Sequence, residues 1–179
     1  MKQTWDDIKW IFVPDGSSRD IYVQDVSICD WGKLIDLLNS KYSMRIDKEY
    51  AIKYLTDESG EMESKSVTID LNKIGLHCHF FLPDQIEFDI EPKEINSIED
   101  FQNIEKFMEE VSKTLNNQVT LTGDNSPRFP LVKIDYNKGI NIINRTGSTQ
   151  VLGKSKFNQI SNKAFKGKIS TDVLPKKVS

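Results

Sequence analysis

The chain has 179 residues, of which 37% are hydrophobic and 28% are charged, a composition typical of a soluble globular protein with one domain. No apolar run approaches the roughly 20 residues that a membrane helix needs. The N-terminus lacks the basic start and apolar core of a secretory signal. Cys29 and Cys78 are the only cysteines, too few for a disulfide framework. We therefore expect a cytoplasmic protein with two reduced, buried thiols and no membrane partner.

The net charge of −3 conceals an uneven distribution. Residues 154–179 contain seven lysines and one aspartate, a net charge of +6, so the first 153 residues carry −9. Asp84–Glu110 alone has ten acidic side chains and two lysines, a net charge of −8. An acidic body argues against nucleic-acid binding by the body and leaves the basic tail as the candidate for such contacts.

The first half of the chain predicts strands, turns and one helix. Pro14-Asp15-Gly16 is a turn signal, and it predicts a hairpin between the strands Trp10–Val13 and Ile21–Val26. Ser27 and Asp30 form an N-cap pattern, followed by apolar residues at helical spacing to about Asn39. Two further strands are predicted on either side of a polar, Gly-containing loop: Ile46–Leu55 and Ser66–Leu71.

The second half predicts a hairpin, a long helix and three more strands. Ser97 and Asp100 resemble a capping box, and the apolar stripe after them predicts a helix that ends near Asn116. The remaining predicted strands are Leu76–Leu82, Ile86–Glu91, Val119–Thr122, Leu131–Tyr136 and Ile140–Ile143.

Along the chain, most of the predicted strands follow one another as adjacent hairpins. This arrangement predicts an α+β fold: a mainly antiparallel sheet with two amphipathic helices packed on one face. We expect a single domain over residues 1–145. The Gly, Ser and Thr content after Asn144 predicts a linker, so residues 146–179 form a linker and a lysine-rich tail.

The hairpin at Leu76–Glu94 contains both histidines of the chain, one cysteine and several carboxylates. Side chains alternate between the two faces of a strand, so a three-residue loop at Pro83-Asp84-Gln85 pairs Cys78 with Ile90 on the apolar face. The same loop pairs the polar residues on the other face as follows: Phe81 with Glu87, His79 with Asp89, and His77 with Glu91.

Three interpretations of this polar face stay open. It can be a solvent-facing strand whose histidines balance acids, or a divalent-metal site with His77, His79, Asp89 and Glu91 as ligands. Acid/base catalysis needs a concave site as well, and the sequence shows none. The chain has no glycine-rich nucleotide loop, C-x-x-C or H-E-x-x-H motif, so we expect no cofactor and assign no catalytic residue.

The acidic stretch has alternatives of its own. It is either a solvated edge with the polar face of a helix, a surface for a basic protein partner, or a docking site for the lysine-rich tail. The partner interpretation predicts the binding residues Glu87, Asp89, Glu91, Glu94, Glu99 and Asp100.

Two stretches, WIFVPDGSSRDIYVQD (Trp10–Asp25) and IEFDIEPKEI (Ile86–Ile95), resemble segments of small, uncharacterised bacterial α+β proteins. Some of those proteins are similar to the immunity partners of secreted toxins. The resemblance implies a stoichiometric binder that blocks a toxin, not an enzyme, with a basic toxin domain as its partner. The lysine-rich tail is not part of that pattern.

Overall fold

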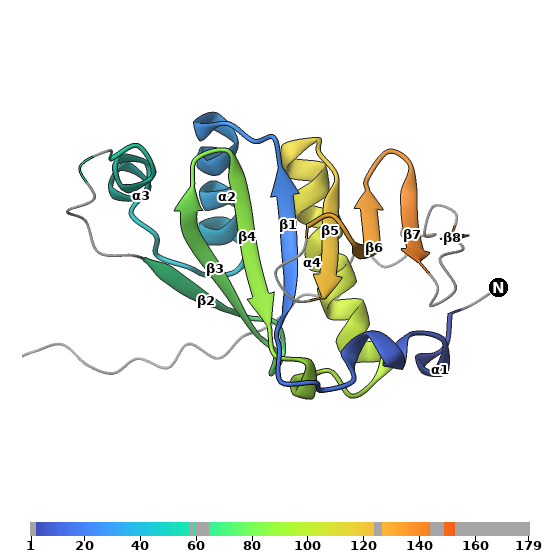
Figure 1. Cartoon of the computed structure of the whole chain (residues 1–179). Helices are drawn as coiled ribbons and strands as arrows, with labels where there is room; N and C mark the ends of the chain where they lie inside the picture. Colours follow the sequence, from blue (N-terminus) through green and yellow to red (C-terminus); the bar gives the residue numbers. More distant parts are fainter. Residues whose placement is uncertain (1–2, 58, 60–64, 124–126, 144–148, 153–179) are drawn as a thin grey trace, which may run out of the picture.

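The structure, a computed structural model, describes residues 3–57, 59, 65–123, 127–143 and 149–152. These residues form one eight-stranded sheet with the order β2-β3-β4-β1-β5-β6-β7-β8 (Figure 1). Every neighbouring pair is antiparallel, which confirms the predicted α+β class. The strands are β1 (Arg19–Gln24), β2 (Ser66–Asp70), β3 (Gly75–Leu82), β4 (Gln85–Ile90), β5 (Val119–Gly123), β6 (Pro130–Asp135), β7 (Gly139–Ile143) and β8 (Thr149–Leu152).

Two long helices, α2 (Ile28–Lys41) and α4 (Ile98–Leu115), pack on one face of the sheet and lie behind it in Figure 1. Both begin as predicted, because the Ser27 and Ser97 hydroxyls accept hydrogen bonds from the backbone N–H groups of Asp30 and Asp100. Their apolar stripes are buried against the inward side chains of the strands. No helix in the described part of the chain is long and apolar enough to cross a membrane.

Two predicted strands are wrong. Trp10–Val13 lies mostly in a 3₁₀ helix, η1 (Lys9–Phe12), which follows the short helix α1 (Trp5–Ile8). Ile46–Leu55 contains a third helix, α3 (Lys48–Leu55), whose first turn is capped by the Asp47 carboxylate accepting from Tyr50 N–H. Ala51 and Leu55 are buried and lie four residues apart, the spacing of a helix face.

Arg19 explains why Trp10–Val13 is not a strand. Its guanidinium is buried and donates hydrogen bonds to the backbone carbonyls of Ile11 (2.6 Å) and Val13 (2.9 Å). It also forms an ion pair with Asp15 (3.1 Å) in the turn, and this contact holds the pKa of the Asp15 carboxyl below its usual range. The carbonyls that a hairpin ladder would use are therefore held by a side chain.

The sheet continues past the predicted domain boundary at residue 145. Strand β8 pairs with β7, with Ile143 opposite Thr149 and Ile140 opposite Leu152. Strand β8 therefore lies within the residues 146–179 that the sequence predicts as a linker and tail. The lysine-rich tail, predicted from residue 154 onward, lies outside the described residues.

A second short 3₁₀ helix, η2 (Pro92–Glu94), joins β4 to α4. On the helix side, the Trp31 ring stacks on Phe80 with 5.1 Å between centroids, and its Nε1 donates to the Leu82 carbonyl (3.1 Å). Phe88 meets Phe107 of α4 edge-on at 5.1 Å. These contacts fix the β3–β4 hairpin from inside, so its other face is turned away from α2 and α4.

Candidate functional site on the open face of the sheet

We call the side of the sheet opposite α2, α3 and α4 the open face, because no described helix covers it (Figure 1). Its central side chains follow from strand alternation, since buried Ile21, Val23, Ile86 and Phe88 point toward the helices. The side chains between them therefore face the other way. On β3, β4 and β1 they are His77, His79, Phe81, Gln85, Glu87, Asp89, Asp20, Tyr22 and Gln24.

The hairpin places its polar residues on the predicted face but in a different register. His77 lies opposite Asp89 and His79 opposite Glu87, each two residues from the predicted partner. A register shift between His79 and Leu82, together with a tighter turn that pairs Leu82 with Gln85, accounts for the difference. A shift of two residues keeps every side chain on its face.

His79 and Asp89 nevertheless meet, as a diagonal pair. The His79 Nε2 atom contacts the Asp89 carboxylate, and the imidazole stacks on Phe81 with ring centroids 4.8 Å apart. The Nδ1 atom of His77 lies 2.9 Å from the Thr68 hydroxyl on β2. Both histidines are therefore engaged by neighbours on the open face.

Three carboxylates gather at the centre of this face. Asp20 of β1 lies opposite Asp89 of β4, and Tyr22 lies opposite Glu87. The Tyr22 hydroxyl donates a long hydrogen bond to Asp20 (3.4 Å). Burial raises the pKa of Glu87 above its usual value, and the nearby Asp20 charge adds to the shift. Burial also raises the pKa of Tyr22.

We refer to Asp20, Glu87 and Asp89 as the acidic centre. Asp20 lies directly opposite Asp89, and like charges in such a cross-strand pair repel each other. Asp20 is only 2% exposed, and its carboxylate accepts hydrogen bonds from the Ser18 and Tyr22 hydroxyls.

The other predicted binding residues lie elsewhere. Glu91 is exposed and forms an ion pair with Lys93 (3.2 Å), and the Glu94 carboxylate accepts a hydrogen bond from Gly75 N–H (2.8 Å). Glu99 and Asp100 belong to the first turn of α4, which packs on the opposite side of the sheet. Of the six residues, only Glu87 and Asp89 belong to the group of carboxylates at the centre of the open face.

The predicted metal ligands do not converge. Within the described residues, no group of three or more His, Cys, Asp or Glu side chains is placed to hold a metal ion. Cys78 is buried on the helix side, where burial raises its thiol pKa. Cys29 is exposed in the first turn of α2, so the prediction of two buried thiols is wrong for this residue.

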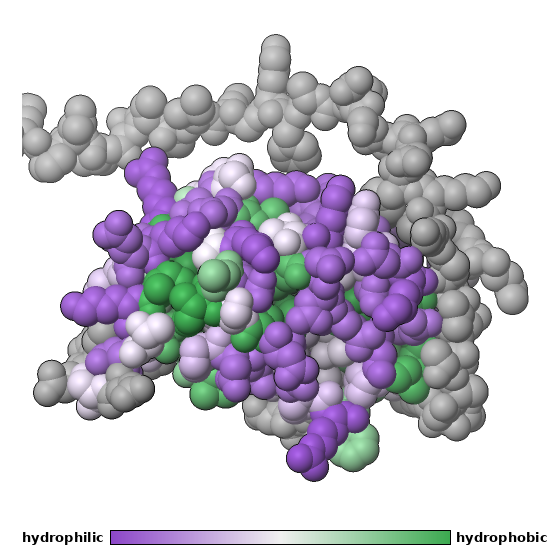
Figure 2. All heavy atoms as spheres, turned by 90° about the horizontal axis from the view of Figure 1, so that it is seen from above, coloured by the Kyte–Doolittle hydropathy of each residue, from purple (hydrophilic) through white to green (hydrophobic). Residues whose placement is uncertain are grey.

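Exposed apolar side chains lie beside the acidic centre, at the end of the hairpin. Phe81 is 52% exposed and Leu82 is 47% exposed. Seen from above, the surface is mostly hydrophilic, with a hydrophobic patch on the side where α3 and the β3–β4 hairpin lie (Figure 2). The Phe81 ring stacks on His79, which contacts Asp89, so an exposed apolar ring lies next to this ion pair.

Asp20 and Tyr22 are not among the site residues that the sequence predicts. Their alternation with Ile21 and Val23 was visible, and it places both residues on one face of the strand. What was missing was the pairing of β1 with β4, which joins residues 61 or more positions apart.

No protein-family model, no curated protein and no solved structure matches this chain. Inference about its function therefore starts from the chemistry of the open face.

Proposed function

We propose that this chain is a non-enzymatic, cytoplasmic protein that binds another protein through its open face. The acidic centre supports the proposal: Glu87 and Asp89 lie on β4 of the open face, beside Asp20 of the adjacent strand β1, and the Asp89 carboxylate contacts His79. A partner that presents lysine or arginine would complement the carboxylates of Glu87 and Asp89.

The raised pKa of Glu87 supports a cationic partner. Partial burial and the charge of Asp20 disfavour the ionised carboxylate in the free protein. A guanidinium or ammonium group placed nearby would favour the ionised form. Contact with such a group would therefore contribute favourable electrostatic energy to binding.

The exposed hairpin end adds an apolar component to the same surface. Phe81 stacks on His79 and still exposes half of its area. Protein interfaces commonly combine a buried aromatic anchor with charged groups that orient the partner. Phe81 is our candidate for that anchor, and Glu87 and Asp89 are the orienting charges.

We further propose that the protein is an immunity-type inhibitor of a bacterial toxin, with a basic toxin domain as its partner. The two stretches that resemble such proteins contain the paired strands β1 and β4. Together these stretches supply Asp20, Tyr22, Glu87 and Asp89, so the resemblance and the acidic centre coincide.

Affinity capture from the native host, followed by mass spectrometry, would identify the partner, and titration of the purified pair would measure its affinity. The double variant Glu87→Lys/Asp89→Lys should weaken binding at least about a hundredfold, because close interfacial charge pairs contribute roughly 1.5–7 kcal/mol. Circular dichroism and thermal unfolding would establish that the variant folds.

Glu99→Lys is the matched control, since it reverses an acidic charge of the same stretch on the other side of the sheet. Its affinity should stay within about twofold of the original chain. Equal loss for both variants, or none for the double variant, would reject the open face as the binding surface. Failure of the chain to protect cells that express the captured partner would reject the immunity role alone.

A further inference from the structure

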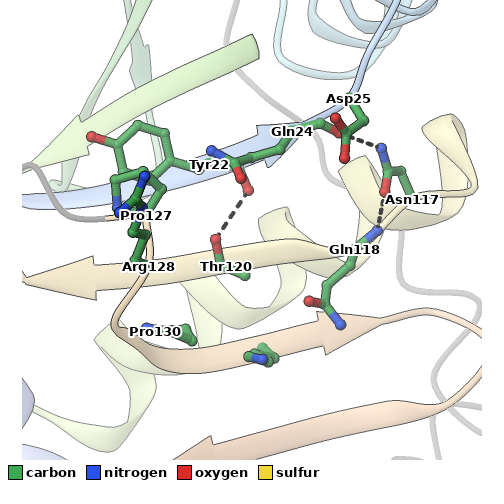
Figure 3. A pocket seen from close by; sticks show the side chains of 10 residues that line it. Tyr22, Gln24, Asp25, Asn117, Gln118, Thr120, Pro127, Arg128 and Pro130 are labelled. Atoms are coloured by element: carbon green, nitrogen blue, oxygen red, sulfur yellow. Dashed lines mark hydrogen bonds between the residues drawn. The ribbon is translucent and has the colours of Figure 1, made fainter. Parts of the chain in front are cut away.

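A polar cleft opens beside the acidic centre, between the end of β1 and strands β5 and β6 (Figure 3). Its volume is about 250 Å³, and its lining includes Tyr22, Gln24, Gln118, Thr120, Arg128 and Lys133. Thr120 pairs with Tyr22 on one side and with Lys133 on the other. The floor of the cleft therefore belongs to the same open face as the acidic centre.

Two cationic side chains of the cleft, Arg128 and Lys133, have no partner in the part of the chain that the structure describes. Neither side chain makes a hydrogen bond or ion pair within the described residues. Other lysines of the chain do so, among them Lys33, Lys48 and Lys138. Arg128 is exposed and Lys133 is half-buried, so both charges are available to a ligand.

The neutral amides of the cleft differ in how far they are already used. The Asn117 amide is used, because it donates to the Gln24 carbonyl (2.8 Å) and accepts from Gln118 N–H (2.7 Å). The exposed Gln118 side-chain amide is not held in this way. Asp25 is the one carboxylate of the lining, and Figure 3 places it at the Gln24–Asn117 end, away from Arg128.

We propose that this cleft binds a carboxylate side chain, aspartate or glutamate, of the protein partner. Arg128 and Lys133 supply the charge, and guanidinium–carboxylate pairs are among the stronger polar contacts available. The inference rests on the proposed function, since it gives the open face a second subsite of opposite charge.

The two subsites have a defined spacing. Glu87 of β4 and Lys133 of β6 are separated by β1 and β5 in the sheet, that is, by three inter-strand steps or about 14 Å. Tyr22, buried between them, pairs with Glu87 on one side and Thr120 on the other. A partner with a basic and an acidic side chain about 14 Å apart would dock in one orientation only.

The subsite can be tested without the partner. Glutamate blocked at both backbone termini is titrated into the ¹⁵N-labelled chain, with blocked glutamine as the neutral isostere. We expect saturable amide shifts at Gln118, Thr120 and Lys133 with the glutamate probe, and none with the glutamine probe. The variant Arg128→Gln/Lys133→Gln should raise the dissociation constant about tenfold or more, since each lost charge-assisted contact weakens binding substantially.

Lys106→Gln, an exposed lysine of α4 on the other side of the sheet, is the control and should bind the probe as the original chain does. Equal shifts with both probes, or unchanged affinity in the double variant, would overturn the proposal. Saturable binding of inorganic phosphate without binding of blocked glutamate would also overturn it and assign the cleft to phosphate. These outcomes are independent of partner capture, so they separate this subsite from the proposed function.

Discussion

Glu105 is a half-buried carboxylate on α4, on a helix whose apolar side faces the core. Burial raises its pKa to about 7, and the neighbouring Glu109 charge acts in the same direction. The folded state therefore keeps a proton on Glu105 at pH values where the unfolded chain has already lost it. The pKa of Glu105 is near 4.5 in the unfolded chain and near 7 in the folded protein. As the pH rises between these two values, the contribution of Glu105 to the free energy of unfolding decreases.

Glu105→Gln should consequently stabilise the fold at pH 8 by on the order of 1 kcal/mol, less than the full shift implies because water still reaches the side chain. At pH 4 the advantage should vanish, since Glu105 is protonated in both states. Urea unfolding at the two pH values measures the difference. Glu49→Gln, at an exposed position on α3, is the control. An equal effect of Glu105→Gln at both pH values would contradict the argument.

Residue-level prediction succeeded where a side chain acts on its own backbone neighbours. Ser27 caps α2 through Asp30 as the sequence indicated. Prediction failed where a side chain binds backbone groups several residues away, as the Arg19 guanidinium does at the carbonyls of Ile11 and Val13. An alternating pattern cannot reveal that a distant guanidinium will bind the carbonyls of the predicted strand.

The β3–β4 hairpin is the element on which the site depends. Its two faces were predictable, because alternation has a period of two residues and one face is apolar. Its register was not, because the irregularity between His79 and Leu82 shifts the pairing by two residues. Such irregularities arise from local backbone geometry that residue types alone do not specify.

Two phenylalanines on opposite faces of this hairpin should differ sharply in their effect on stability. Phe88 is fully buried against Phe107, so Phe88→Ala should cost about 3–5 kcal/mol. Phe81 is 52% exposed, so Phe81→Ala should cost less than about 1 kcal/mol. Chemical denaturation of both variants provides the comparison. A similar loss for both would mean that the hairpin faces are assigned incorrectly.

The whole molecule is organised around β1, which pairs with β4 on one side and β5 on the other. The predicted hairpin would have made Trp10–Val13 its neighbour instead. The central position brings Asp20 and Tyr22 between the acidic hairpin and the cationic cleft. The single open face thereby carries charges of both signs.

The end of the sheet lies beyond the composition change at residue 145. Strand β8 pairs with β7 over four residues, and each backbone hydrogen bond contributes about 0.5–1.5 kcal/mol net. A chain that ends at Leu152 should therefore be more stable than one that ends at Ile143, by on the order of 1–3 kcal/mol. Thermal unfolding of the two shortened chains tests this, and equal stability would place the domain boundary near residue 145.

The sequence by itself determined the α+β class, the two capped helices and the polar face of the hairpin, because each follows from periodicity or from contacts a few residues apart. Only the tertiary structure decided the neighbours of β1, the helical state of Lys48–Leu55 and the separation of Glu87 and Asp89 from Glu99 and Asp100. The physical reason is that strand order and helix placement depend on burial between segments far apart in the chain. A run of acids that is continuous in sequence is therefore divided between the two sides of the sheet.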